Sequence, residues 1–283
     1  GGGRLRSKGN RGGEKMNLTE NLHTHTFRCG HASGEDREYV EAAIRAGVRV
    51  LGFADHSPMV FPASSGYFLP FRMRLDAFEG YVTSILELRR AYAGEIELLI
   101  GAEMEYYPEL FRDTLTFMAD YPLDYLIMGQ HFIGNEYDGE GLHTIIPSDD
   151  PARLAAYVDQ VLAGLATGAY TYLAHPDVFR FTGDDADYRR ENLRLLRGAR
   201  DMGIPVEFNF LGFREKRHYP RRLFWELVRE VGNDVVFGLD AHSPDVFGME
   251  DDLRAMGDYV SGLGLTPLRH IPLRDPRQAL TKA

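Results

Sequence analysis

The feature that most constrains this chain is the recurrence of histidines and acids at or near the ends of short apolar segments. Seven of the ten histidines lie in such groups, which run from one end of the chain to the other. Imidazole and carboxylate are ligands of divalent metals, and imidazole favours Zn, Mn or Fe over Mg or Ca. The pattern therefore predicts a fold that gathers strand ends around a metal site. The groups are His23-Thr24-His25, His31, Asp55-His56, Glu103, Gln130-His131, His175-Pro176-Asp177 and Asp240-Ala241-His242.

Strand-like and helix-like segments alternate from Met16 onward. Several strand candidates are nearly continuous apolar runs, as expected for a parallel sheet that is covered on both faces. The amphipathic stretches between them have apolar residues at helical spacing. The expected strands are 22–25, 50–56, 96–106, 125–132, 171–178, 206–210 and 235–242. The expected helices are 38–47, 76–92, 154–165, 188–202 and 221–231.

This alternation predicts an α/β fold with a parallel sheet, either closed into a barrel or left open. In a βα barrel the functional site lies at the carboxyl ends of the strands. Every candidate ligand is expected there except His31, which falls in the loop that follows its strand. An open doubly wound sheet would draw its site from two or three strands. Ligands from at least six strands therefore favour the barrel.

Composition narrows the class of protein further. No composition break or internal repeat divides residues 16–283, which predicts a single domain. Residues 1–15 are Gly-rich and basic, and we expect a disordered segment that is a cloning remnant or follows a misplaced start codon. No apolar run is long enough to span a membrane, and a single cysteine fits the reducing cytoplasm. A net charge of −10 argues against nucleic acid as a partner but not against a small anion at a local metal site.

Each histidine alone has an ordinary explanation as a hydrogen-bonded core residue or a solvated one. Spacing makes that explanation less adequate for the set, because residues two apart on a strand share a face. His23 and His25 have this spacing, and so do Glu103 and Glu105. Two acids on one interior face are costly unless they are paired or bound to a metal.

Other residues near these groups have different expected roles. Asp55 and Asp177 suit carboxylates that orient a neighbouring imidazole, and a surface or helix-capping role is nearly as plausible for Asp177. Cys29 could be a soft metal ligand, although a small free thiol is the more common role. Three histidines are expected at the solvated surface: His143, His218 and His270.

The set of motifs resembles the PHP (polymerase and histidinol phosphatase) superfamily, from about Leu22 to His242. The motifs are His-x-His, a further His six residues on, Asp-His, Gly-x-Glu, Gly-x-His, His-Pro-Asp and Asp-x-His. The chain is more specifically similar to the histidinol-phosphate phosphatase branch. The segments that carry this likeness are His-Ser-Pro, Phe-Arg-Met, Gly-Ala-Glu-Met-Glu-Tyr-Tyr-Pro and the Glu-Phe-Asn at 207–209.

The resemblance implies a distorted (β/α)7, TIM-like barrel with three divalent metal ions, of Zn, Mn or Fe. By position, one metal takes His23, His25, Glu103 and Asp240. A second shares Glu103 and adds His131 and His175, and a third takes His31, His56 and His242. The chain departs mildly from the family at Gln130, Phe210 and Phe213, and the two phenylalanines are expected to affect the shape of the substrate pocket.

The implied reaction is hydrolysis of L-histidinol phosphate in histidine biosynthesis, by attack of metal-held hydroxide on phosphorus. Three divalent cations and two carboxylates leave about +4 of charge, which suits a phosphate dianion. Glu103, Asp240 and His242 are the expected catalytic residues. Candidate substrate-binding residues are Arg180 and Arg214 for the phosphate, Lys216 and Arg28 as second choices, Glu105 for the amine, and Phe132 or Tyr107 for the imidazole ring.

The long aromatic loop 57–74 is expected to act as a lid over the site. Two other functions remain open at this stage. One is a superfamily phosphoesterase that acts on nucleotides or nucleic-acid ends, which the long loop and the acidic charge disfavour. The other is a metal-binding module without activity, which nine intact ligand positions disfavour.

Overall fold

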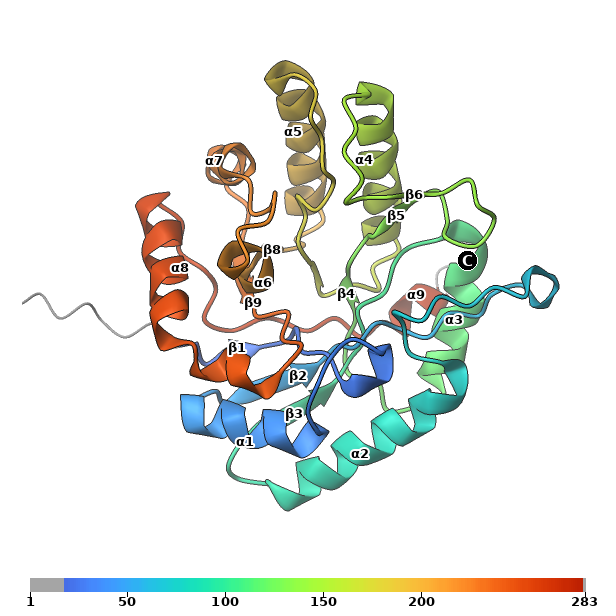
Figure 1. Cartoon of the computed structure of the whole chain (residues 1–283), viewed down its shortest axis with the longest axis vertical. Helices are drawn as coiled ribbons and strands as arrows, with labels where there is room; N and C mark the ends of the chain where they lie inside the picture. Colours follow the sequence, from blue (N-terminus) through green and yellow to red (C-terminus); the bar gives the residue numbers. More distant parts are fainter. Residues whose placement is uncertain (1–17, 282–283) are drawn as a thin grey trace, which may run out of the picture.

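The computed structural model describes residues 18–281, and within that range seven short parallel strands form the centre of the molecule, with helices around them (Figure 1). The strands fall into a three-stranded sheet, β1-β2-β3, and a four-stranded sheet, β4-β7-β8-β9. Their bounds are β1 Glu20–Asn21, β2 Val50–Phe53, β3 Glu97–Ile100, β4 Ile127–Met128, β7 Tyr172–Leu173, β8 Val206–Asn209 and β9 Val235–Gly238.

Isolated parallel bridges join the two sheets at both edges and close the ring. One pairs Glu103, beyond β3, with Ile127 of β4, supported by the bond from the Met104 amide to the Ile127 carbonyl. The other pairs Thr24, beyond β1, with Ala241, beyond β9. We call these two joints the seams of the barrel. The predicted seven-stranded, TIM-like barrel in a single domain is confirmed.

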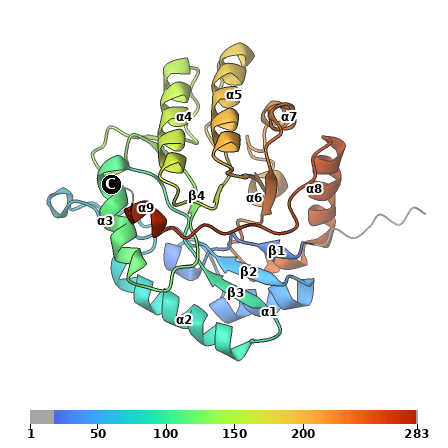
Figure 2. The ribbon, with the colours of Figure 1, turned by 180° about the vertical axis from the view of Figure 1, so that it is seen from behind.

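Helices follow the strands and cover the outside of the ring, while the segment after α8 crosses the face seen in Figure 2 to reach α9 beside α3. Local signals explain several helix ends. Glu35 and Glu38 form a capping box at the start of α1, and Gly47 ends it in the left-handed conformation. The α-helices of the described residues are α1 Asp36–Ala46, α2 Phe78–Ala91, α3 Pro108–Ala119, α4 Pro151–Ala166, α5 Asp185–Asp201, α6 Phe210–Arg214, α7 Arg222–Val231, α8 Glu250–Gly262 and α9 Gln278–Thr281.

The hydrogen-bonded strands are shorter than the sequence predicts. The first expected strand, 22–25, is wrong in its bounds: β1 ends at Asn21, and only Thr24 of that segment forms a bridge. The sequence also gave no prediction for α3, α6, α8, α9 or the antiparallel pair β5 (Phe132–Ile133) and β6 (Leu142–His143). The proposals about residues 1–15 lie outside the described residues. Across residues 18–281, no helix has the length and apolar character needed to cross a membrane.

Candidate metal centre

The carboxylate of Glu103 is the centre of the site. Glu103 lies just beyond β3, is 1% exposed, and contacts histidines that come from both sheets. Gly129 makes this placement possible, because a Cβ there would lie 1.9 Å from Oε1 of Glu103. The separations between a Glu103 oxygen and a ring nitrogen are 3.5 Å for His23, 3.6 Å for His25, 3.2 Å for His56, 3.6 Å for His131 and 2.7 Å for His175.

Asp240 and His242 complete the cluster from the end of β9. Oδ1 of Asp240 is 3.0 Å from Nε2 of His25 and 3.5 Å from Nε2 of His23. His242 turns toward the loop after β1, where its Nε2 lies 3.1 Å from Nε2 of His31. Ligand atoms of His31, His56 and His242 lie within 4.8 Å of one another, as do those of His23, His25 and Asp240. All nine predicted metal ligands therefore meet at one end of the barrel.

Several of these buried atoms have no hydrogen-bond partner among residues 18–281. They include Nε2 of His23, Nε2 of His25 and Oε2 of Glu103, all within a few ångströms of each other. Leaving such atoms unsatisfied costs about 1–3 kcal/mol each. Divalent cations would satisfy them together, and the mixture of imidazole and carboxylate donors suits Zn, Mn or Fe. The residues fit a divalent-metal centre.

Three buried carboxylates orient histidine rings by contacting their Nδ1 atoms, on the side away from the metal centre. Nδ1 of His23 contacts Glu207 at 2.7 Å, Nδ1 of His25 contacts Asp55 at 3.3 Å, and Nδ1 of His131 contacts Glu105 at 2.7 Å. A carboxylate accepts, so each Nδ1 carries the proton and each Nε2 keeps its lone pair for a metal. The predicted role of Asp55 is confirmed. Glu207 was missed as a partner of His23, although a glutamate inside the apolar sixth expected strand was a usable signal.

Backbone strain accompanies two of the ligands. Asp240 has φ of 50° and His175 has φ of 27°, positive values that are uncommon outside glycine, although Asp and His adopt them more often than most residues. Such conformations cost about 1–3 kcal/mol each and cluster at functional sites. The strain therefore supports a functional role for these two positions.

Comparison with known proteins decides the family. The model of the PHP domain matches residues 21–209, which is more than half of the chain. The chain belongs to the PHP domain family. It is 30% identical to a probable histidinol-phosphatase of Deinococcus radiodurans, over 80% of this chain and 87% of that protein. It is 31% identical to the histidinol-phosphatase of Bacillus subtilis, over 78% and 92% of the two chains.

Solved structures agree on the fold of this PHP domain. The histidinol phosphate phosphatase of Lactococcus lactis, complexed with zinc, L-histidinol and phosphate, superposes with a TM-score of 0.66 at 19% identity. The match covers 89% of this chain and 95% of that one. A putative histidinol phosphatase of Listeria monocytogenes gives a TM-score of 0.67 at 18% identity, over 81% and 97%.

A cavity of about 770 Å³ opens beside the metal centre of the PHP domain. One part of its wall is apolar and comes from the loop predicted to be a lid, through Leu69, Pro70 and Phe71. Another part is charged and comes from the segment after β8, through Arg214, Glu215 and Arg217. The loop thus lines the cavity, and its closure stays a prediction.

Only some of the expected substrate-binding residues reach this cavity. Arg214 lines it, whereas Arg180 and Lys216 are exposed side chains outside the lining. Arg28 is also outside, because its guanidinium pairs with Asp36 at 2.9 Å. Arg217 was missed, since nothing in the sequence distinguishes it from its charged neighbours.

Glu105 and Tyr107 were assigned wrongly to the substrate. Glu105 is 1% exposed, and its two oxygens are occupied by Arg72 and His131. Tyr107 is fully buried and donates to Glu136 at 2.7 Å. Phe132 packs against Phe71 outside the lining. Two other aromatic side chains do line the cavity: Phe71, whose ring is 5.3 Å from the His56 ring, and Tyr219.

The departures from the family pattern are structural. Phe210 is fully buried and Phe213 packs on Phe208, so neither shapes the cavity as expected. Gln130 is also buried, and its amide donates to the Phe132 carbonyl. The departures therefore leave the cavity wall untouched.

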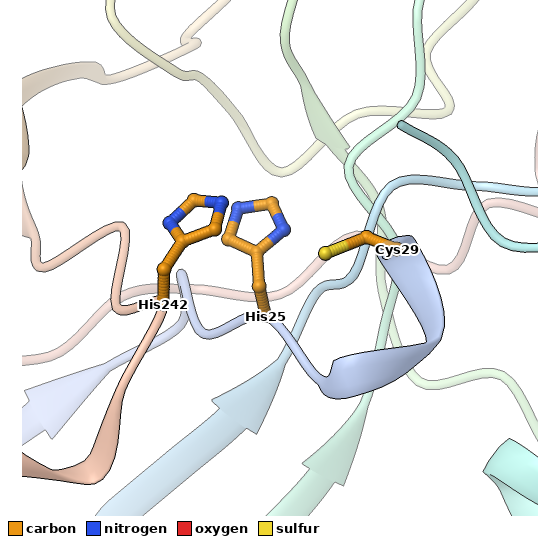
Figure 3. Close-up of side chains that lie close together, drawn as sticks. All are labelled: His25, Cys29 and His242. Atoms are coloured by element: carbon orange, nitrogen blue, oxygen red, sulfur yellow. The ribbon is translucent and has the colours of Figure 1, made fainter. Parts of the chain in front are cut away.

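Cys29 lies beside His25 and His242 (Figure 3) and is fully buried. Its Sγ, a ring nitrogen of His25 and a ring nitrogen of His242 lie within 4.8 Å of one another, but the thiol also donates to the Thr26 carbonyl. Asp177 is buried, and its carboxylate accepts the amide of Arg221, just before α7, and the indole N–H of Trp225 within α7. Asp177 therefore holds the start of α7 in place and does not lie at the surface.

The three histidines expected at the surface differ in their environment. His270 is exposed and contacts Glu20 at 2.8 Å. His218 is half-buried and its Nε2 donates to the Val178 carbonyl. The expectation is wrong for His143, which lies in β6 and lines the cavity.

Metal retention is expected to fall as the pH falls. Burial lowers the pKa of His23, but the carboxylates of Glu207, Asp240 and Glu103 outweigh it and raise this pKa well above its usual value. Protons therefore compete with metals at this ring at any pH below the raised pKa, at about 10-fold in affinity per pH unit for each proton displaced. Dialysis at pH 8 and pH 6 followed by elemental mass spectrometry should give fewer metals per chain at pH 6. Equal contents would contradict the competition.

Proposed function

We propose that this chain is a metal-dependent phosphatase that hydrolyses L-histidinol phosphate to L-histidinol and phosphate. The observation that carries the proposal is the Glu103 carboxylate, surrounded by five histidine nitrogens at 2.7–3.6 Å, beside a cavity large enough for a small substrate. The named function of the Deinococcus and Bacillus relatives supports the choice of substrate. A small phosphorylated substrate also suits the locally cationic centre of an otherwise acidic chain.

Three cations of Zn, Mn or Fe would be held by the sets His23, His25, Glu103, Asp240; Glu103, His131, His175; and His31, His56, His242. Bound there, they would lower the pKa of water to about 7 and neutralise phosphate oxygens. The remaining work falls to the chain's own residues. Glu103 and Asp240 would set the charge of the centre, and His242 would complete its open side, where it is about one fifth exposed.

Arg214 and Arg217 are proposed to bind the phosphate from the other side of the cavity. Nε of Arg214 is buried and finds no hydrogen-bond acceptor in the part of the chain that the structure describes, which leaves a donor available in this wall. Glu215 holds both guanidiniums, at 3.2 Å from Arg214 and 2.6 Å from Arg217. Glu215 is also the acid of the lining that is placed to pair with the substrate amine, in the role first expected of Glu105. Phe71 offers an apolar face for the imidazole ring.

Steady-state kinetics test the proposal. We expect kcat/KM for histidinol phosphate to exceed the values for nucleoside monophosphates and for an aryl phosphate by at least about 100-fold, as a site that pairs the substrate's polar groups should give. Equal values for all three substrates would remove the assignment to histidinol phosphate but leave a metal phosphatase. No hydrolysis of any of them by metal-loaded protein would remove both.

His143→Ala is expected to raise KM by about 10-fold, because it removes one hydrogen bond from His143 to the substrate in the cavity. The metal content should stay unchanged. Nδ1 of His143 accepts the Ile145 amide, so a neutral ring carries its proton on Nε2. Burial, aided by the charge of His131, lowers the pKa of His143 to about 4 and keeps the ring neutral at pH 7. His270→Ala, on the exposed surface, is the control. A KM equal to that of the wild type would show that His143 does not contact the substrate.

A further inference from the structure

Arg72 is a buried cation that the proposed reaction does not use. It lies at the end of the loop that lines the cavity, directly after Phe71, and is 1% exposed. Its Nε donates to Glu136 at 2.9 Å, and its Nη1 donates to the Ser57 carbonyl at 2.9 Å. Both Nη1 and Nη2 donate to Oε2 of Glu105 at 3.1 Å. Burial of a guanidinium costs desolvation free energy, and the ion pairs and hydrogen bonds of Arg72 must offset this cost.

The two oxygens of Glu105 divide their partners between Arg72 and the metal centre. Oε2 accepts from the guanidinium, and Oε1 accepts from Nδ1 of His131. The proton on Nδ1 leaves Nε2 of His131 free, 3.6 Å from Glu103. The orientation of the His131 ring thus depends on where Arg72 holds Glu105.

The other two carboxylates that orient histidines are held differently. Asp55 accepts the His56 amide and the Thr26 hydroxyl, and Glu207 accepts from Asn209 and the His175 amide. Their partners are neutral groups at or next to the metal ligands themselves. Glu105 instead depends on a charged side chain from the loop, which Glu136 of the β5–β6 connection and Tyr107 hold in place.

We propose that Arg72 is a positioning residue of the metal centre, which acts through Glu105 to hold His131 in its metal-binding orientation. The same side chain fixes Phe71 on the cavity wall, where the Arg72 guanidinium lies 4.8 Å from the Phe71 ring centroid. Arg72 therefore connects the wall that faces the substrate to a metal ligand. This inference rests on the metal centre of the proposed function but not on the identity of the substrate.

The test measures metal retention in Arg72→Met, Glu105→Gln and the double variant, each loaded with Co²⁺ or Zn²⁺ and then challenged with a chelator. Loss of a carboxylate behind a histidine ligand weakens metal binding by about 10–100-fold. We expect Arg72→Met to release metal about 10-fold faster than the wild type. The double variant should release metal no faster than Glu105→Gln. Arg72 acts through Glu105, so the effects of the two substitutions should not add.

A spectrum separates positioning from general stability. The visible bands of bound Co²⁺ should change in Arg72→Met and stay unchanged in Arg74→Met, a control in the same loop whose side chain is 62% exposed. Wild-type bands and retention in Arg72→Met, with only a lower Tm, would overturn the proposal, as would additive effects in the double variant. If Arg72→Met does not fold, Glu136→Gln replaces it, and wild-type retention there would likewise overturn the proposal. A wild-type chain that binds no Co²⁺ at all would instead refute the metal centre itself.

Discussion

Glu103→Ala is expected to lower kcat/KM for histidinol phosphate by about 10³-fold or more and to reduce the metal content of the purified protein. The carboxylate lies within 3.6 Å of ring nitrogens from five histidines, so its loss affects two of the three proposed ligand sets at once. It also removes one of the two carboxylates that balance the cations. Losses of this size are usual when charge stabilisation at a reacting centre is removed.

Glu109→Ala provides the matched control for this variant. Glu109 is an exposed glutamate in the first turn of α3, six residues along the chain from Glu103. Its substitution should leave kinetics and metal content at wild-type values. Full metal occupancy in Glu103→Ala, measured by elemental mass spectrometry, would contradict the bridging role even if activity were lost.

Removal of the metals is expected to lower the Tm by about 10 °C or more. Each cation that binds only the folded chain contributes about 4 kcal/mol at a thousandfold excess over its Kd. For a domain of this size, each kcal/mol corresponds to about 2–4 °C. Without metal, Nε2 of His23, Nε2 of His25 and Oε2 of Glu103 remain buried and unsatisfied. Calorimetry before and after treatment with a chelator measures the shift.

Reloading supplies the control for this experiment. Addition of Zn²⁺ or Mn²⁺ to the stripped protein should restore the Tm, because the ligand positions are set by the barrel. His270→Ala should show the same shift as the wild type, since His270 lies on the exposed surface. A Tm that the chelator leaves unchanged would mean that the metals contribute nothing to stability.

The barrel and the metal ligands could be predicted because their signals are local and repeated. Alternation of apolar strands and helices indicates a parallel sheet, and the two-residue spacing of His23 and His25 places both side chains on one face. Strand ends of a barrel then meet by geometry alone. The exact strand bounds could not be predicted, because the regular ladder stops before the ligands although the apolar pattern runs on, as at Asn21 before His23.

The substrate side of the site was predicted less well, because loops place it. Arg180, Arg214 and Lys216 are equivalent in sequence terms, and only the path of the chain after β8 decides that Arg214 and Arg217 line the cavity. Glu105 has the right residue type and spacing for a functional acid. Its partner Arg72 lies 33 positions earlier, in a loop with no periodic pattern, so the pairing had no local signal.

The seams of the barrel have a consequence for hydrogen exchange. Each seam is held by few backbone bonds, such as those of the His25 amide to Ala241 and the Met104 amide to Ile127. Each proposed ligand set draws side chains from both sheets, so the metals would tie the three-stranded part to the four-stranded part. In metal-free protein the seam amides should then exchange before those inside either sheet, by opening of the ring into two arcs. The bound cations would then hold the three-stranded and four-stranded sheets together, and without them the two sheets would separate at the seams.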